Sequence, residues 1–412
     1  MSLAFQPGAA MREHVRDIPI YRRAIDRNFF PILEKPEIAS DFPHNWMTPR
    51  LASALKSGAA EFVMSTGTHH ARMHIIRPPY FLLNSYYQLW GAHPDIRFTW
   101  EQGCQRVSLT TVLATEHVAS VNARKHGPVH RDAADTASRR LDARTLYLNK
   151  TLDPAQWTRA ELERMLAEIE KARCMHPQGF YHLDCSSYHL AHFVLKLAEF
   201  GLERDFPQPA SIVHAYEYTP GNVRRLLRNR FACPIIDLFG STELGYMFYS
   251  DRQGCYTSHL DKMHVELLPL APDSSIYSLI ISSIRNPYMP LIRYRSGDCA
   301  QTIDHSPDPA KIKRFCGREK EMWHTPFGVM AQADFDDLIG AASADIFVYQ
   351  LQLKADEEPQ LRYTTFSGER ASHHAVATLR DALRAATGLT IAIEHSAHIA
   401  IGKSGKYAWL PQ

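Results

Sequence analysis

The sequence has no long hydrophobic run, no excess of one charge and no paired cysteine motif. None of its apolar segments approaches the ~20 residues that a membrane-spanning helix needs. Lys and Arg number 46 against 44 Asp and Glu, a formal net charge of +2, which gives no electrostatic reason to expect a nucleic-acid or membrane-surface partner. Charges interrupt segment 1–17 before the apolar core of a signal peptide could form. We therefore expect a cytoplasmic protein that binds neither nucleic acid nor a membrane.

The seven cysteines are scattered along the chain, and no two of them form a C-x-x-C pair. An odd number without framework spacing predicts reduced thiols rather than disulfides. The 22 histidines leave one alternative open, which is a zinc site assembled from distant Cys and His side chains. No ligand spacing in the sequence supports that alternative.

The chain's 412 residues suit one large domain with a smaller one. Between residues 158 and 239, helical and extended patterns alternate. They predict a helix over 158–174 with Thr158 as its N-cap and Glu161 three residues on, a helix over 186–201, a strand over 210–218, a helix that opens at Pro220 and a strand over 234–239. This alternation predicts an α/β fold with a mostly parallel sheet.

After residue 260 the pattern changes to consecutive strands, at 263–270, 274–284 and 290–298, which predict a β-rich subdomain. A charged, glycine-bearing segment, 311–322, then precedes a stretch with α+β character. Domain boundaries fall where charge clusters between two ordered regions. We therefore predict an N-terminal domain over 1–316 and a small α+β domain over 317–412.

Three polar segments each follow a predicted strand. They are "STGT" (65–68), "FGSTELG" (239–245) and "IRYRSGD" (292–298). A hydroxyl-rich turn around one glycine can offer backbone N–H groups and hydroxyls to phosphate oxygens. The first segment alone is also typical of an ordinary polar turn.

Taken in order, these segments resemble the motifs of the adenylate-forming (ANL) superfamily, which includes acyl-CoA synthetases, peptide-synthetase adenylation domains and luciferases. "FGSTE" resembles its Y-G-x-T-E motif, and "YRSGD" resembles Y-R-T-G-D. "CGREKEM" (316–322) is similar to the hinge segment G-R-x-K/D-E, and "SGKYAWL" (404–410) is similar to the C-terminal G-K motif. Four matches in the family's order, at about its separations, make the resemblance specific.

Within the superfamily, the sequence most resembles the phenylacetate–CoA ligase and coenzyme F synthetase-like group. The resemblance rests on "IPIYRR", "FFPILEKPEI", "HPQGFYHLDCSSYHLAHFVLKLAEFGL" and "IVHAYEYTPGNVRRLL", so it spans nearly the whole chain. The acyl-protein synthetases of bioluminescence share parts of this pattern and remain an alternative.

The resemblance implies ATP-dependent activation of a carboxylic acid to an acyl-adenylate, with release of pyrophosphate and transfer to a thiol. ATP and Mg²⁺ would be required, and CoA is the acceptor most relatives use. A carrier-protein phosphopantetheine, a protein cysteine or an amine are alternative acceptors. The domain over 317–412 would be a mobile lid on the large domain, with Lys320 at the hinge. A homodimer is left open.

The resemblance also assigns roles to individual residues. Lys406 would stabilise the α-phosphate, Thr242 would bond a phosphate oxygen and Glu243 would hold Mg²⁺; Lys403, three residues before Lys406, leaves the register open. The nucleotide would further contact Ser65, Thr66, Gly67, Thr68, Ala215, Tyr216, Glu217, Phe239, Gly240, Ser241, Asp298 and Arg318.

The acyl pocket of the family lies beside the segment that precedes the adenine loop. Here its lining would include Tyr181, His182, Ser187, Tyr188 and Tyr246. Such an aromatic-rich lining suits an aryl or medium apolar carboxylate. The same aromatic side chains are also compatible with an ordinary core.

The phosphate loop departs from the family pattern T-S-G-T-T-G-x-P, because the sequence reads "STGTHHARMH". His70 replaces the second glycine and Arg72 replaces the proline. His69, His70 and Arg72 could supply cationic contacts in place of backbone N–H groups. Alternatively, the chain is a catalytically degenerate homologue that binds a nucleotide or an acyl ligand. The magnesium, ribose and lysine motifs all persist, which favours an active enzyme.

Overall fold

The computed structural model describes residues 5–64, 73–111, 139–258, 263–271, 274–354 and 357–411. The chain packs as two compact units. The first combines Met1–Ala92 with Leu238–Lys320, and the second combines His93–Asp237 with Glu321–Gln412. The chain therefore passes between units for the last time after Lys320, within the charged segment. The mobile lid remains a prediction, and each unit is described by itself.

The N-terminal part of the first unit is built from short helices and one hairpin. Strand β1 (Glu61–Met64) pairs antiparallel with β2 (His74–Arg77). The helices are α1 (Ala9–Val15), α2 (Arg22–Asp26), α3 (Lys35–Ala39), α4 (Pro49–Ser57) and α5 (Phe81–Ala92), with 3₁₀ turns at Pro19–Tyr21 and His44–Trp46.

The rest of the first unit is the predicted β-rich subdomain. It is a four-stranded antiparallel sheet of β10 (Met263–Pro269), β11 (Ile276–Ser283), β12 (Leu291–Thr302) and β13 (Ile312–Arg318), in that order. All eight residues of β11 are buried, as expected for a central strand whose two faces are both covered. Side chains from one face of the four-stranded sheet and from the N-terminal helices pack into one hydrophobic core.

The second unit contains the predicted parallel sheet. Its strands are β3 (Gln105–Leu109), β4 (Thr145–Tyr147), β5 (Tyr181–Cys185), β6 (Ser211–His214) and the first residues of β7 (Ile235–Ser241), in the order β4-β3-β5-β6-β7. The last residues of β7 belong to the first unit, where they pair antiparallel with β8 (Gly245–Ser250), which in turn pairs with β9 (Tyr256–Ser258).

Local capping signals account for the helices between these strands. Helix α8 (Arg159–Cys174) begins after Thr158, whose side chain accepts a hydrogen bond from the N–H of Glu161 in a complete capping box, as predicted. Helix α9 (Ser187–Glu199) begins after the N-cap Ser186, and α10 (Gly221–Arg230) begins one residue after Pro220. The smaller helices are α6 (Arg97–Glu101) and the 3₁₀ turns Pro154–Gln156 and Glu203–Asp205.

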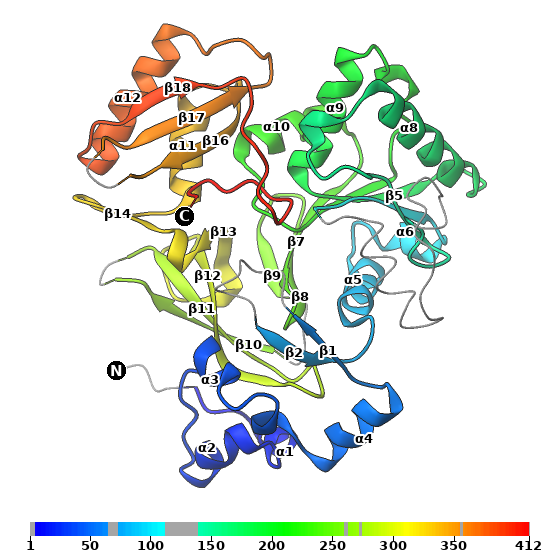
Figure 1. Ribbon diagram of the computed structural model, residues 1–412, viewed down its shortest axis with the longest axis vertical. Helices are drawn as coiled ribbons and strands as arrows, with labels where there is room; N and C mark the ends of the chain where they lie inside the picture. The colour runs from blue at the N-terminus through cyan, green and yellow to red at the C-terminus, as the bar shows by residue number, and fades with distance from the viewer. Residues whose placement is uncertain are drawn as a thin grey trace. The chain divides into compact units, whose positions relative to one another are not determined.

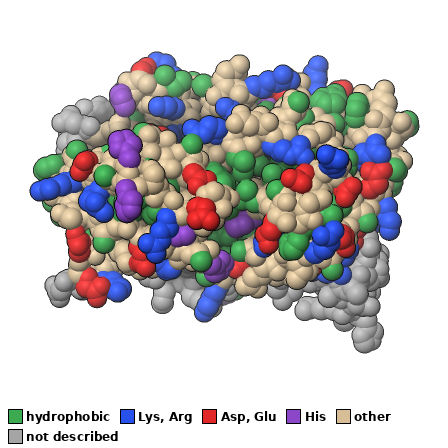
Figure 2. All heavy atoms as spheres, turned by 90° about the horizontal axis from the view of Figure 1, so that it is seen from above, with side chains coloured by type: hydrophobic (Ala, Val, Ile, Leu, Met, Phe, Trp, Pro, Cys, Tyr) green, Lys and Arg blue, Asp and Glu red, His purple; other side chains and the backbone are tan. Residues whose placement is uncertain are grey.

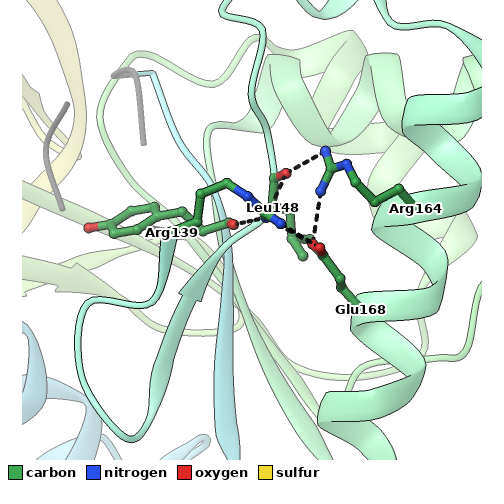
Figure 3. Close-up of polar contacts among 5 residues, drawn as sticks. Arg139, Leu148, Arg164 and Glu168 are labelled. Carbon is green, nitrogen blue, oxygen red and sulfur yellow. Dashed lines mark hydrogen bonds and ion pairs between the residues drawn. The ribbon is translucent and has the colours of Figure 1, made fainter. Parts of the chain in front are cut away.

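A buried ion pair fixes the chain where it re-enters the described structure at Arg139. The guanidinium of Arg139 bonds both carboxylate oxygens of Glu168 on α8 and the carbonyl oxygen of Tyr147 at 2.6 Å. Arg164 donates to the same carboxylate at 2.9 Å and to the carbonyl oxygen of Leu148 at 2.8 Å (Figure 3). One carboxylate thus ties the edge strand β4 to α8.

The C-terminal part of the second unit has the predicted α+β character. Strand β16 (Ile346–Gln352) pairs antiparallel with β17 (Gln360–Thr365), which pairs parallel with β18 (Ala392–His395). Helices α11 (Gln332–Ala342) and α12 (His373–Thr387) pack on each other and enclose a core with this sheet (Figure 1). The remaining elements are β14 (Trp323–Thr325), β15 (Gly328–Met330) and the 3₁₀ turns Pro309–Lys311 and Glu319–Glu321.

The surface carries both basic and acidic side chains, and neither charge predominates. On the face drawn in Figure 2, basic and acidic side chains are interspersed among apolar ones, in line with the net charge of +2. All seven cysteines are free thiols. No helix in the described part of the chain combines the length and the hydrophobicity that a membrane crossing requires.

Candidate active site

The predicted site residues are distributed over both units. The phosphate-loop residues Ser65, Thr66, Gly67 and Thr68 lie outside the described residues. The first unit carries the residues predicted to hold magnesium and ribose and the predicted hinge residue. The second carries the residues predicted for the adenine and the acyl group and the C-terminal lysine.

The "FGSTELG" segment forms the tight turn between β7 and β8. Gly240 pairs with Tyr246 across this hairpin, and a Cβ at position 240 would lie 2.5 Å from the carbonyl oxygen of Gly245. The hairpin itself therefore requires a glycine there. Ser241 accepts a hydrogen bond from the N–H of Leu244 at 3.3 Å. The turn presents Thr242 and Glu243 from its middle.

Glu243 links the first two motifs in space. Its side chain is buried, and the hydroxyl of Tyr294 donates to its Oε1 at 2.9 Å. Tyr294 is the central residue of "IRYRSGD" on β12 and is fully buried. Burial, followed by the charge of Glu243, raises the pKa of Tyr294 well above its usual value, so the phenol remains a donor. Sequence reasoning quoted Tyr294 within its motif but assigned it no role.

Asp298 lies four residues after Tyr294, opposite Arg318. The two residues are register partners on β12 and β13, and the guanidinium Nε of Arg318 lies 3.6 Å from the carboxylate. Burial raises the pKa of Asp298 above its usual value, and the negative charge of Glu243 acts in the same direction, while Arg318 and Lys35 oppose it. The described structure thus brings Glu243, Asp298 and Arg318 into one electrostatic neighbourhood.

Phe239 and Tyr246 flank the turn on either side. The ring of Phe239 stacks on Phe315 with the centroids 3.7 Å apart, so one of its faces already has a protein partner. The backbone N–H of Tyr246 donates to Ser85 on α5 at 2.8 Å, and the guanidinium of Arg285 donates to the carbonyl oxygen of Tyr246 at 3.1 Å. Sequence reasoning missed Arg285, because no motif marks it.

The hinge residue Lys320 is exposed and ends the first unit. Beside it, Glu319 accepts from the guanidinium of Arg295 at 3.0 Å, and Arg295 also reaches Glu34 at 3.4 Å. The two arginines of "IRYRSGD" thus differ in role. Arg293 pairs with Glu266 on β10 at 2.9 Å, whereas Arg295 contacts the segment that leads out of the unit.

In the second unit, the predicted adenine segment follows β6 directly. Ala215 is buried and donates its N–H to the carbonyl oxygen of Cys185 at 2.9 Å. Tyr216 has a positive φ of 82°, which is unusual for a bulky side chain. Its hydroxyl donates to Asp184 at 2.6 Å, and this contact holds the segment against the end of β5.

Asp184 is the centre of a buried polar cluster that sequence reasoning did not identify. Besides Tyr216, its carboxylate accepts hydrogen bonds from Arg106 at 2.5 Å and from the hydroxyl of Ser108 at 2.8 Å. Arg106 and Ser108 alternate on β3, and Asp184 lies opposite Ser108 in the parallel register. The signal was present in the sequence as charged residues within otherwise apolar strand patterns.

The predicted acyl-pocket residues divide into two kinds. Tyr181 and His182 are buried and have protein partners: the tyrosine hydroxyl donates to the carbonyl oxygen of Pro207 at 2.6 Å, and the imidazole Nδ1 lies 2.6 Å from the hydroxyl of Ser211. Ser187 is buried, and its hydroxyl has no hydrogen-bond partner among the described residues. Tyr188 packs its ring against Tyr407, with the centroids 4.8 Å apart.

Lys406 lies in a tight turn that ends the chain's C-terminal motif. The N–H of Gly402 donates to the carbonyl oxygen of Lys406, and the N–H of Gly405 donates to that of Gly402, both at 2.9 Å. Gly405 has a φ of 71°, and a Cβ there would lie 1.8 Å from the carbonyl oxygen of Thr111. The turn is thus in direct contact with the backbone two residues after the end of β3.

The adenine segment and the lysine turn meet at Glu217. Its carboxyl group accepts a hydrogen bond from the backbone N–H of Tyr407 at 3.2 Å and shares another with the hydroxyl of Ser186. Burial raises the pKa of Glu217 to about 7, while Ser186 and Lys406 act in the opposite direction. Three residues predicted for separate roles, Glu217, Tyr188 and Lys406, therefore lie in one neighbourhood of the second unit.

Comparison with known proteins gives the fold. No protein-family model matches the sequence, and no curated protein does either. A crystal structure of 2-hydroxyisobutyryl-CoA ligase in the postadenylation state is similar with a TM-score of 0.64 at 13% identity, over 98% of this chain and 87% of the other. The anthranilate CoA ligase AuaEII in complex with anthranoyl-AMP has a TM-score of 0.56 at 14% identity, over 84% and 65%.

A third similar structure is the amide bond synthetase McbA from Marinactinospora thermotolerans, with a TM-score of 0.55 at 12% identity, over 84% of this chain and 66% of the other. At these identities the likeness shows the fold alone. The predicted α/β fold of the adenylate-forming ligases is therefore confirmed.

Proposed function

We propose that the protein activates a carboxylic acid with ATP. A carboxylate oxygen of the acid attacks the α-phosphorus, the bond to the bridging oxygen breaks, and pyrophosphate leaves. A thiol then attacks the acyl carbon, and AMP leaves. The observation that carries this proposal is the meeting of two motifs distant in sequence, in which Glu243 and Asp298 lie in one neighbourhood and Tyr294 bonds the first of them.

The donor chemistry around Glu243 suits Mg²⁺, which prefers carboxylate oxygens and keeps part of its water shell. The hydroxyl of Tyr294 donates to Oε1 of Glu243. This bond orients the carboxylate and leaves Oε2 without a hydrogen bond from the described residues. Glu243 would hold the ion, and Mg²⁺ when bound would neutralise charge on the phosphates. Thr242, next in the same turn, would donate its hydroxyl to a phosphate oxygen.

Asp298 would bind the two ribose hydroxyls, because a carboxylate accepts two hydrogen bonds side by side. Arg318, 3.6 Å away, would add a contact to the ribose or a phosphate. A partly buried carboxylate whose pKa stays raised beside an arginine is a candidate for a functional site. A ribose that supplies two donors would satisfy it.

Lys406 would stabilise the negative charge that develops on the α-phosphate during the attack. Positioned cationic donors contribute most at such a point, because the charge is larger in the transition state than in the bound substrate. The lid movement about Lys320 would bring this lysine to the reacting atoms and remove it for the second step. In this proposal Lys403 has no part in the chemistry.

For the acid, we propose an aryl or medium apolar carboxylate. The buried hydroxyl of Ser187 supports a ligand near the start of α9, because a buried polar group without a partner is rare unless a ligand or water satisfies it. Tyr188 supplies an aromatic surface next to it. CoA is the proposed acceptor, and a carrier-protein phosphopantetheine, a protein cysteine or an amine is the alternative.

The test is release of pyrophosphate from ATP and Mg²⁺ over a panel of aryl and aliphatic carboxylates, without CoA, with the adenylate identified by mass. We expect release with a subset of acids. Glu243→Gln and Lys406→Ala should each lower the rate by about 10²–10³, whereas Lys403→Ala and the surface variant Glu163→Gln should not.

If folded protein that still binds AMP releases no pyrophosphate with any acid of the panel, the proposal is overturned in favour of a degenerate homologue. If wild-type protein is active and both Glu243→Gln and Lys406→Ala keep wild-type rates, the residue assignment is wrong. Addition of CoA, a phosphopantetheine carrier or an amine to the active mixture then identifies the acceptor.

A further inference from the structure

The turn that carries Lys406 is held on the second unit by a small set of contacts. Its backbone packs on Thr111 through Gly405. The ring of Tyr407 lies against Tyr188, and its hydroxyl lies 2.9 Å from Nε2 of His192. The backbone N–H of Tyr407 donates to Glu217 at 3.2 Å, one residue from the lysine. Glu217 is thus well placed to fix where Lys406 lies.

The hydrogen-bond pattern around Ser186 shows in which form Glu217 makes these contacts. The Nε2 of His189 lies 3.1 Å from the carbonyl oxygen of Leu152. A carbonyl oxygen only accepts, so Nε2 must carry the proton. Burial lowers the pKa of His189 to about 4, so near neutral pH its other nitrogen, Nδ1, has no proton and must accept.

The Nδ1 of His189 lies 3.0 Å from the hydroxyl of Ser186. Ser186 has a single proton, which this bond uses. The same hydroxyl oxygen accepts from the backbone N–H of His189 at 3.3 Å and is in hydrogen-bond contact with Oε1 of Glu217. With the Ser186 proton given to Nδ1, we infer that the proton of the contact with Oε1 comes from Glu217. A protonated Glu217 donates to Ser186 through one oxygen and accepts from Tyr407 through the other, and every group in the chain is then satisfied.

We propose that Glu217 is a positioning residue that, as a neutral carboxylic acid, holds the C-terminal turn so that Lys406 is set for the adenylation step. The inference rests on the proposed function of Lys406. It replaces a direct contact of Glu217 with the adenine by an indirect role through the lysine turn.

The sign of the pH dependence follows from the raised pKa. The described titratable groups that face Glu217 are Tyr188 and His189 on α9 and Lys406 and Tyr407 on the turn. Burial keeps His189 neutral, and it raises the pKa of both tyrosines well above 10. Glu217 has its pKa near 7 in the docked state, above the ordinary value of 4.5.

A docked turn therefore binds a proton that a solvent-exposed Glu217 would release. This contribution to docking is complete below pH 4.5, the ordinary value, and is lost as the pH rises through about 7. The turn should be held most tightly below pH 4.5 and should loosen progressively as the pH rises to about 7.

The first experiment measures hydrogen exchange in the tail, over 403–411, and needs no substrate. Glu217→Leu removes both the donor and the acceptor, and should speed exchange of the Tyr407 amide by about five- to tenfold, as expected for one lost hydrogen bond. Glu217→Gln is the isostere of the protonated acid, and should keep the protection. Glu199→Leu, an exposed change on α9, is the matched control and should match the wild type.

The pH series separates a proton-dependent role from simple packing. After correction for intrinsic exchange, wild-type protection should fall as the pH rises from 4.5 to about 7, and Glu217→Gln should hold it constant. The Gln variant also separates the pH effect of Glu217 from any effect of His398. This half-exposed histidine precedes the tail and lies 3.4 Å from Asp153. An unchanged exchange rate in Glu217→Leu, or the wild-type pH dependence in Glu217→Gln, would overturn the proposal.

The second experiment uses pyrophosphate release with an accepted acid. Glu217→Leu should lower kcat with an unchanged KM for ATP, and should cause no further loss in a Lys406→Ala background, because it acts through the lysine. A raised KM for ATP with an equal loss in both backgrounds would mean an adenine contact and refute the proposal. If wild-type protein is inactive with every acid, the function fails, while the exchange result still decides whether Glu217 holds the turn.

Discussion

The substitution Gly405→Ala tests most directly whether the docked turn matters. Gly405 has a φ of 71°, and an added Cβ would lie 1.8 Å from the carbonyl oxygen and 2.7 Å from the carbonyl carbon of Thr111. Both are backbone atoms two residues after the end of β3, which cannot move as a flexible side chain can. The turn itself must therefore leave its place.

The size of the effect follows from what the departure breaks. Alanine at positive φ costs about 1–2 kcal/mol relative to glycine. Displacement also removes the bond from Tyr407 to Glu217 and strains those between Gly402, Gly405 and Lys406, worth about 1 kcal/mol each. The sum, roughly 3–5 kcal/mol, is enough to undock a terminal segment. The core around α11 and α12 includes Trp409, three residues beyond Lys406, and the N–H of Leu351 donates to the carbonyl oxygen of Trp409 at 2.6 Å. These contacts lie beyond the turn and should keep the core folded.

Three measurements check this expectation. Exchange over 402–407 should lose most of its protection, adenylation should fall by about as much as in Lys406→Ala, and the denaturant midpoint should move little, because Trp409 stays in its core. Gly368→Ala is the matched control, because Gly368 has a φ of 77° but no atom within 4 Å of the added Cβ. It should cost about 1 kcal/mol and leave the tail and the activity unchanged. Wild-type protection and activity in Gly405→Ala would refute the reasoning.

Three further substitutions probe buried polar groups. Asp298→Asn should raise the melting temperature at pH 8 and lose this advantage as the pH falls, because a carboxyl group whose pKa is raised on folding costs stability once it ionises. Tyr294→Phe should lower adenylation about tenfold and stability by about 1–3 kcal/mol, because it removes the donor to Glu243. Glu168→Leu should lower the free energy of unfolding by about 3–5 kcal/mol in urea, because it leaves Arg139 buried without its carboxylate.

Each of these expectations has a result that contradicts it. A melting temperature of Asp298→Asn below that of the wild type at pH 8 would mean that the carboxylate is compensated in the folded chain. Wild-type adenylation by Tyr294→Phe would show that the hydroxyl does not orient Glu243. Glu163→Leu, at an exposed ion pair with Arg159 on the same helix, should cost less than 1 kcal/mol; an equal loss at Glu168 and Glu163 would remove the distinction between buried and exposed pairs.

The sequence predicted those features that depend on neighbours along the chain. Thr158 and Glu161 lie three residues apart, and their capping box forms as expected at the start of α8. The strands β6 and β7 are predicted by short segments with two or more apolar residues each, next to helical patterns. The turn at Gly240 follows from its own hairpin. All of these are short-range effects.

Long-range contacts could not be predicted in the same way. The bond from Tyr407 to Glu217 joins residues 190 positions apart, and that from Tyr294 to Glu243 joins residues 51 positions apart. The motifs named these segments, but only the fold shows which of their atoms meet. The passage of the chain between units after Ala92, Asp237 and Lys320 has no local signal, because it depends on which surfaces bury each other.

Comparison of three buried carboxyl groups separates structural from functional burial. At Asp237, burial by itself raises the pKa, but Arg224 and His214 outweigh it, and the net pKa lies well below the usual value. That carboxylate is compensated within the chain and stabilises the fold as an ion. At Asp298 and Glu217 burial wins, and the pKa is raised.

A protein keeps such uncompensated groups at a cost in stability, and they are therefore expected where binding or catalysis uses them. Asp298 has Arg318 only at 3.6 Å, so a ligand that brings donors can supply what the chain does not. Glu217 resolves the same problem by keeping its proton, which serves Ser186 and leaves an acceptor for the lysine turn. The two groups predict opposite responses: a bound nucleotide should lower the pKa of Asp298, whereas docking of the turn should raise that of Glu217.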